Sequence, residues 1–286
     1  MYIKAGIAIL LIVLATGAHG ADEDDCDAAY TWIAKGIDHY NLEKFDFAVW
    51  AFEEAIRASP NCPDAWYFKG LALNEQGNFS GAVQAFEEAI RLDPELGPAW
   101  FNKGVALENL EDYIEAIQAF EKAIELDPEL AFSAWNNIGI VYSEMDYYFE
   151  AVRAYDEAIR LDPEDPLPWS NKGNVLSLME NYTDAIWAYD EAIGLDPENA
   201  SSAWFGKGLA LLSLENYTEA ISAFDEVISM DTELSASAWF NKGVALQSLG
   251  DCTAAIEAYD MAIELDSELS EIVNVNKALC EGDWKA

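Results

Sequence analysis

A tryptophan recurs every 34 or 35 residues through most of this chain, and this period limits the folds that the chain can adopt. A glycine follows each tryptophan by four residues, an alanine by sixteen, and a phenylalanine or tyrosine by twenty. The seven tryptophans are Trp32, Trp66, Trp100, Trp135, Trp169, Trp204 and Trp239. A fixed period of this length indicates a stack of small units, each of which buries its apolar side against its neighbours.

Residues 99–128 show what one unit contains. Trp100 and Leu107 fall on one face of a first short helix, and the apolar residues within 116–124 form a stripe on a second helix. The polar residues 111–112 separate the two helices, and Pro128 ends the second because proline cannot continue a helix. The sequence therefore predicts a helix–turn–helix hairpin as the unit.

This pattern resembles the tetratricopeptide repeat (TPR) family, whose 34-residue units are helix–turn–helix hairpins. The resemblance covers residues 29–269, with repeats that start near residues 29, 63, 97, 132, 166, 201 and 236. It implies an all-α fold, an α-solenoid (superhelix) of seven hairpins. Residues 270–286 match half a repeat and are expected to form a C-terminal capping helix.

Residues 1–20 differ from the repeats. Residues 5–18 form an apolar run interrupted only by Thr16, and Ala18 and Gly20 place small residues before a cleavage point at Ala21. This is the pattern of a secretory signal peptide. A retained membrane anchor is the alternative, although the run is shorter than the roughly 20 residues that span a bilayer. The sequence predicts an exported, extracytoplasmic protein, secreted or at the cell surface, with an acidic leader at 21–28 and no membrane span after signal removal.

The chain is strongly acidic, with 53 Asp and Glu residues against 15 Lys and Arg and a formal net charge of −38. This charge argues against binding nucleic acid or anionic lipid, which both need a positive surface. Two explanations remain: a solvated surface suited to high salt, or a surface that associates weakly with cations or a basic partner. No Asp-x-Asp-x-Asp-Gly loop supports an organised calcium site.

Four cysteines in a chain predicted to be exported favour disulfides. Cys26 precedes the first helix of repeat one and Cys62 follows its second helix, so an antiparallel hairpin brings them together. Cys252 starts the second helix of repeat seven, and Cys280 lies near the end of the capping helix that should run antiparallel to it. We therefore predict the disulfides Cys26–Cys62 and Cys252–Cys280, with free buried thiols as the alternative.

A lysine stands directly before the repeat's glycine, or before Ala278, in all units but one, where Ile138 replaces it. The lysines are Lys35, Lys69, Lys103, Lys172, Lys207, Lys242 and Lys277. They could form a basic track for a carboxylate or phosphate. Because the helical wheel turns this position toward the second helices, we instead predict stems that pack while the ammonium groups reach neighbouring carboxylates.

The opposite face of the first helix lines the concave groove in TPR proteins. Here it carries rings, asparagines and a valine, and the candidate peptide-binding residues are Tyr67, Phe101, Asn102, Val105, Asn137, Asn171, Phe205, Phe240 and Asn241. The bases of the carboxylate clamp found in some TPR domains are missing. Rings bury apolar side chains and carboxamides pair with a peptide backbone, so this face suits an extended neutral or apolar peptide. The alternative is that these residues pack between adjacent repeats.

Little in the sequence favours catalysis. His19 and His39 are the only histidines, and His19 leaves with the signal peptide, so a histidine-dependent nucleophile would rest on His39 alone. No glycine-rich phosphate loop appears. We predict no enzymatic activity, no cofactor and no metal site.

The predicted function is an exported TPR scaffold for protein–protein interaction that binds a peptide or a partner protein in its groove. The alternative is an acidic structural or cell-surface protein, salt-adapted or cation-associated, without a peptide ligand. Four Asn-x-Ser/Thr sequons are possible N-glycosylation sites in an exported chain: Asn78, Asn181, Asn199 and Asn216.

Overall fold

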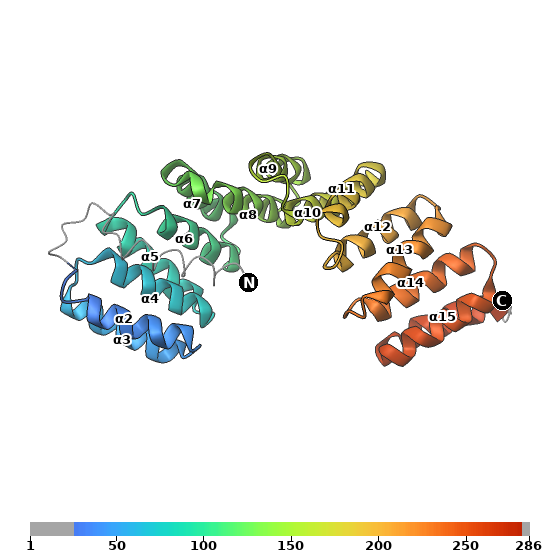
Figure 1. The fold of residues 1–286 in the computed structure, drawn as a ribbon, viewed down its shortest axis with the longest axis horizontal. Coiled ribbons are helices and arrows are strands. Elements are labelled where there is room, and N and C mark those ends of the chain that lie inside the picture. Colours follow the sequence, from blue (N-terminus) through green and yellow to red (C-terminus); the bar gives the residue numbers. More distant parts are fainter. Residues whose placement is uncertain (1–25, 282–286) are drawn as a thin grey trace. The chain divides into compact units, whose positions relative to one another are not determined.

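The computed structural model describes residues 26–281, and the predicted signal peptide (1–20) lies outside them. Those residues form fifteen α-helices and no strand, which confirms the predicted all-α fold (Figure 1). The first helices of the hairpins are α2 (Tyr30–Asn41), α4 (Pro63–Glu75), α6 (Gly97–Asn109), α8 (Ala131–Glu144), α10 (Pro166–Leu178), α12 (Ser201–Ser213) and α14 (Ser235–Ser248). The second helices are α3 (Phe45–Ala58), α5 (Phe79–Leu92), α7 (Tyr113–Leu126), α9 (Tyr148–Leu161), α11 (Tyr182–Leu195), α13 (Tyr217–Ser229) and α15 (Cys252–Leu265), followed by α16 (Ser270–Glu281).

The helices group into two compact units, one ending at Leu130 and the other beginning at Ala131. Within each unit the two helices of a hairpin pack together, and each second helix also packs on the first helix of the next hairpin. The backbones of neighbouring first helices come close to one another in both units, whereas those of neighbouring second helices among the described residues lie farther apart. The first helices are therefore the tighter side of each stack, and we call them the first-helix layer.

The repeated glycine and aromatic residue form the centre of each hairpin. In the third hairpin the Phe120 ring is fully buried and lies over Gly104, where an added Cβ would come within 2.7 Å of the ring. Alanines at positions such as Ala116 and Ala123 are also completely buried. Small residues on both helices thus allow one large ring to fill the space between them.

Short sequence signals end each hairpin. In three of the four Leu-Asp-Pro-Glu segments the aspartate carboxylate accepts a hydrogen bond from the backbone N–H two residues later, as in Asp93 with Glu95 at 3.0 Å. Three tryptophans also donate their indole N–H to the carbonyl of the proline six residues before them: Trp66 to Pro60, Trp100 to Pro94 and Trp169 to Pro163, at 3.1 to 3.3 Å. At these three positions the tryptophan holds the connection between two hairpins.

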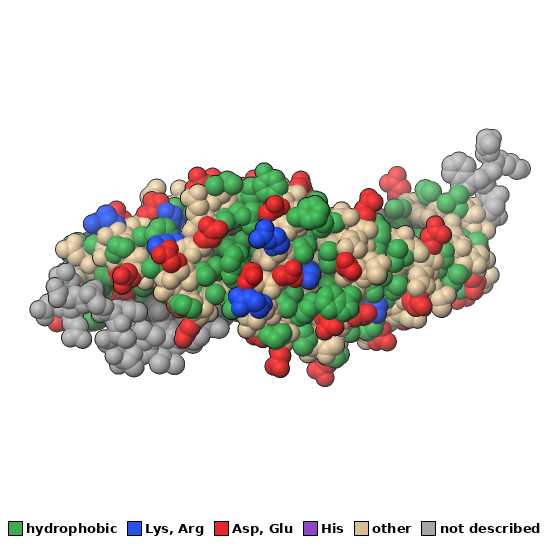
Figure 2. Space-filling view, turned by 90° about the horizontal axis from the view of Figure 1, so that it is seen from above, with side chains coloured by type: hydrophobic (Ala, Val, Ile, Leu, Met, Phe, Trp, Pro, Cys, Tyr) green, Lys and Arg blue, Asp and Glu red, His purple; other side chains and the backbone are tan. Residues whose placement is uncertain are grey.

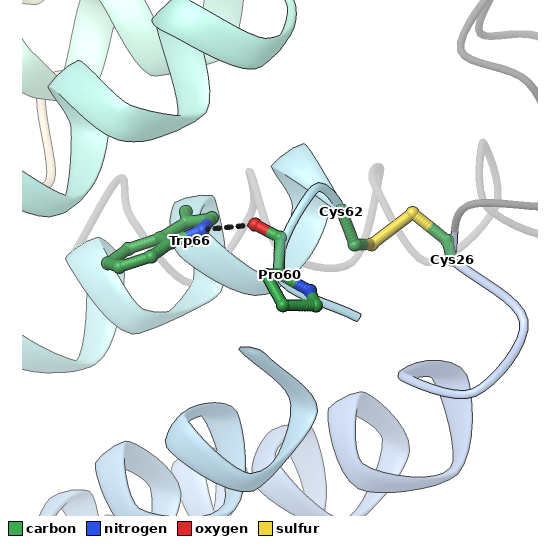
Figure 3. Close-up of a disulfide and its surroundings, with 4 residues drawn as sticks. All are labelled: Cys26, Pro60, Cys62 and Trp66. Atoms are coloured by element: carbon green, nitrogen blue, oxygen red, sulfur yellow. Dashed lines mark hydrogen bonds between the residues drawn. A yellow bond between two sulfur atoms is a disulfide. The ribbon is translucent and has the colours of Figure 1, made fainter. Parts of the chain in front are cut away.

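One predicted disulfide is present. Cys26 is bonded to Cys62 with their Cα atoms 4.9 Å apart, and both cysteines are buried (Figure 3). Figure 3 also shows the hydrogen bond from Trp66 to Pro60 beside it. The bond ties the turn before α2 to the start of α4, so it encloses the whole first hairpin.

The second predicted disulfide is wrong: Cys252 and Cys280 are not bonded to each other. The two cysteines do lie near the same residue, Tyr259: burial and the two nearby thiols raise the pKa of its phenol. A disulfide needs Cα atoms within about 7 Å and Cβ atoms that point toward each other, and the packed helices α15 and α16 fix where Cys252 and Cys280 lie. Cys26 and Cys62 instead precede the helices α2 and α4.

Candidate functional site

The predicted binding rings on the first-helix layer are anchored at one edge. Phe101, Phe205 and Phe240 are half-buried, and each packs against the central ring of its own hairpin at centroid distances of 5.5 to 5.9 Å. Their orientation is therefore held by the core, while part of each ring remains accessible. Val105 is also half-buried, one turn after Phe101 on α6.

Tyr67 differs from these rings because it is buried, with 5% of its surface exposed. Its ring lies 6.0 Å from that of Phe86, and its hydroxyl accepts a hydrogen bond from the Asn102 amide at 3.3 Å. Burial, followed by the nearby Asp64 carboxylate, raises the pKa of Tyr67 and keeps its phenol protonated. Tyr67 is therefore a contact between the second and third hairpins rather than an open surface position.

The predicted asparagines already use their amide nitrogens within the protein. Asn102 donates to the Pro98 carbonyl at 2.8 Å as well as to Tyr67, and Asn241 donates to the Ser237 carbonyl at 2.8 Å. Asn171 donates to the side-chain oxygen of Asn136 at 3.2 Å. Asn137 is half-buried on α8. These bonds fix the carboxamides, so Asn102, Asn171 and Asn241 offer a ligand mainly hydrogen-bond acceptors.

The structure adds two residues that the sequence reasoning missed, Asn136 and Gly206. Asn136 is buried in α8 at the position where other repeats carry a ring, and it contacts the next hairpin through Asn171. In the sixth repeat Gly206 occupies the asparagine position, and a Cβ there would come within 2.5 Å of the Tyr189 ring. The Tyr189 hydroxyl donates to Asn174 at 2.8 Å. The sequence signal for both residues is that they differ from the repeat: Asn136 stands in a ring position and Gly206 in an asparagine position.

In the second unit the kind of side chain on the first-helix layer therefore differs from one helix to the next. The helices α8 and α10 present carboxamides, and α12 and α14 present the anchored rings Phe205 and Phe240. Such a surface combines acceptors for backbone N–H groups with places to bury apolar side chains.

Six of the seven lysines have the predicted structural role, whereas Lys35 is exposed and lies over the Trp32 ring. Each of these six lysines reaches an acidic residue on the second helix of the preceding hairpin, and all but Lys277 also lie over the tryptophan of their own repeat, as Lys103 does with Glu87 at 2.8 Å and Trp100 at 5.6 Å. The ion pairs are Lys69–Glu53, Lys103–Glu87, Lys172–Asp156, Lys207–Asp190, Lys242–Asp225 and, from α16, Lys277–Asp260. These contacts join successive hairpins and leave little of each ammonium for a ligand.

Other candidate positions lie away from this layer. Three of the sequons, Asn78, Asn181 and Asn216, are the N-cap residues of α5, α11 and α13, and Asn199 is exposed in the turn before α12. Among the described residues, one group could place three metal-binding atoms together, formed by Cys26, Cys62 and Asp64. Its two sulfur atoms are joined in the disulfide and cannot act as thiolate ligands. None of the described helices is both long enough and apolar enough to cross a membrane.

Comparisons with known proteins agree with this geometry. Family models described as tetratricopeptide repeat match residues 33–97, 97–130, 132–165, 154–186, 173–233 and 205–269. A search of curated proteins by sequence returns no significant match.

Solved structures with the same fold were also found. YrrB, described as a TPR protein with an unusual peptide-binding site, aligns with a TM-score of 0.56 and 27% identity over 68% of this chain and 99% of its own. The C-terminal part of a TPR protein from Cytophaga hutchinsonii aligns with a TM-score of 0.69 and 15% identity over 82% and 95% of the two chains. A TPR protein from Parabacteroides merdae aligns with a TM-score of 0.63 and 14% identity over 89% and 99%.

Proposed function

This chain belongs to the tetratricopeptide repeat family, and from that premise we propose that it is an exported scaffold that binds an extended, neutral or apolar peptide segment of a partner protein. TPR proteins generally act through protein–protein contacts, and the scaffold is typically non-catalytic. The observation that carries the proposal is the series of anchored rings and fixed carboxamides on the first-helix layer.

Two further features support the peptide part of the proposal. The rings Phe205 and Phe240 are already oriented by the core, so a ligand would not have to order them on binding. YrrB, the relative at 27% identity, is described as having a peptide-binding site.

Export is supported by the signal-peptide pattern of residues 1–20 and by the Cys26–Cys62 disulfide. Disulfides persist in oxidising compartments and are rare where thiols are kept reduced.

The alternative of a purely acidic structural protein is less favoured by the ion pairs. Several second helices carry two adjacent acidic residues, such as Glu87 and Glu88 on α5. The first of the two forms an ion pair with the lysine of the next repeat, as in Glu53–Lys69 and Glu87–Lys103. The second forms an ion pair with an arginine in Glu54–Arg57, Glu88–Arg91 and Glu157–Arg160. Many of the carboxylates on the second helices are therefore engaged within the protein.

The test uses peptides selected from a random library against the full mature chain. A Phe101→Ala/Phe205→Ala/Phe240→Ala variant should bind the selected peptides about tenfold or more weakly, because the apolar contact area is lost. Circular dichroism must show unchanged helix content, since these rings also touch the core. Trp187→Gln, which removes an exposed ring from α11, is the matched control and should bind normally.

Two results would count against the proposal. Peptides that bind the triple variant as tightly as the wild type would place the binding surface elsewhere. Binding that is lost only when calcium is chelated would favour the cation-associated alternative.

A further inference from the structure

The turn between α8 and α9 departs from five of the other six turns within hairpins. Five of the second helices have Asn or Asp at the N-cap, namely α5, α7, α11, α13 and α15. The N-cap of α9 is Tyr147, whose side chain has no acceptor suited to capping; among the five Asn and Asp caps, those of α5 and α15 make the side-chain capping bond. Two residues later Phe149 stands where α11, α13 and α15 carry threonine. Two aromatic residues thus replace residues that suit a helix start.

Both replaced positions are open to solvent. Phe149 is 73% exposed, more than any other large hydrophobic residue among those described, and Tyr147 is 52% exposed. We call Tyr147 and Phe149 the turn patch. Single exposed apolar residues are ordinary, but two aromatic rings in place of a helix cap are not explained by folding.

The turn patch is held in place by buried residues beneath it. The Tyr147 ring lies 6.5 Å from that of Tyr142, and Tyr142 and Tyr148 pack against a buried cluster that contains Tyr155 and Val175. Tyr155 belongs to α9 and Val175 to α10, so two hairpins support the turn. A surface held in this way can bind a partner without first being ordered.

Exposed carboxylates flank the patch along the chain. Glu144, Asp146 and Glu150 are all exposed and lie within three residues of Tyr147 or Phe149. Asp146 accepts a hydrogen bond from the Tyr148 hydroxyl at 2.6 Å. The one basic residue beside the patch along the chain is Arg153, which is exposed and lies four residues after Phe149 on α9, and none lies between it and Lys122. Three carboxylates against one guanidinium leave the flanks of the aromatic patch net negative, which favours ammonium or guanidinium groups by both ion pairing and cation–π contact.

We propose that the turn patch is a second interaction surface, separate from the first-helix layer, which binds a basic amphipathic segment of a partner protein. Apolar side chains of that segment cover Tyr147 and Phe149, and its Lys or Arg side chains pair with Glu144, Asp146 and Glu150. A second copy of this chain is a poorer occupant because it carries the same negative charge, and an anionic lipid surface is repelled for the same reason.

The test titrates the full mature chain with a synthetic amphipathic peptide made of leucine and lysine, and with a leucine–glutamate peptide of the same pattern. The variant Tyr147→Asp/Phe149→Thr reproduces the Asp251 and Thr253 of the seventh repeat. It should bind the basic peptide about tenfold or more weakly, although it adds a negative charge. Its melting temperature should be equal or higher, because aspartate is the better cap.

The matched control is Ile114→Thr, which alters the corresponding position of α7, where Ile114 is 53% exposed. This variant should bind the basic peptide like the wild type. The proposal is overturned if the wild type does not bind that peptide, if the double variant binds it equally well, or if the leucine–glutamate peptide binds as tightly. It is also overturned if the double substitution abolishes self-association of the wild type or its binding to neutral lipid vesicles, since the occupant would then be a second copy or a membrane.

Discussion

At the scale of single residues, the glycine in each first helix sets how closely the two helices of a hairpin approach. The ring opposite it, such as Phe120 opposite Gly104, is completely buried and occupies the volume where a side chain would begin. A glycine within a helix is destabilising by about 0.5–1 kcal/mol relative to alanine, and burial of the large ring offsets this loss of stability. The same pair recurs in every hairpin.

We expect Gly104→Ala to lower the free energy of unfolding by about 1–3 kcal/mol, because its Cβ would lie within 2.7 Å of the Phe120 ring. The control is Gly194→Ala in α11, where an added Cβ meets nothing within 4 Å. That substitution should stabilise the protein by about 0.5–1 kcal/mol through helix propensity alone. Urea unfolding followed by circular dichroism measures both, and two changes of the same sign would contradict this account of the repeated glycine.

At the scale of helices, three kinds of contact join one hairpin to the next. The indole-to-proline hydrogen bonds close three of the connections, the lysine ion pairs bridge successive hairpins, and the Cys26–Cys62 disulfide closes the first hairpin. Within the described part of the chain, the first hairpin packs on the second hairpin alone. Terminal units of repeat proteins open most readily for this reason, so a covalent closure has most effect there.

Reduction of Cys26–Cys62, which spans 36 residues, should destabilise the first hairpin by about 4 kcal/mol in the loop-entropy treatment. Hydrogen exchange should then increase in α2 and α3, while exchange in α10 to α14 should not change. Faster exchange throughout both units would show that the disulfide supports the whole fold instead.

The same structure predicts the thiol count. Protein that is purified under oxidising conditions and unfolded without reductant should react with a thiol reagent at two cysteines, Cys252 and Cys280. A count of zero reactive thiols would show that Cys252 and Cys280 are bonded to each other after all. A count of four would show that the Cys26–Cys62 disulfide is absent.

At the scale of the whole molecule, the formal net charge of −38 is the dominant property. Red acidic side chains are spread over the face shown in Figure 2, with fewer blue basic ones among them. Charges of one sign repel each other in the compact state, and added salt shortens the range of that repulsion to about 10 Å at 0.1 M.

We therefore expect the melting temperature to rise when sodium chloride is increased from about 10 mM to about 0.5 M, because screening weakens self-repulsion more than it weakens the short ion pairs. Calcium chloride at the same ionic strength should give a similar increase. Equal melting temperatures at low and high salt would refute salt adaptation. A much larger increase with calcium would instead favour specific cation association.

The sequence by itself determined the hairpins, their order and their closures. The reason is that each repeat is stabilised by its own helices and its neighbours, so structural contacts recur with the sequence period. For the same reason it located the disulfide Cys26–Cys62 and the structural lysines such as Lys103.

Only the tertiary structure decided which residues of the first-helix layer are open to a ligand and which contacts form. It buried Tyr67 between hairpins, engaged the amide of Asn102 within the protein, and kept Cys252 and Cys280 from bonding. A period places a residue on a face of a helix, but exposure, hydrogen bonding and disulfide formation depend on separations between helices of an ångström or two, which the period does not specify.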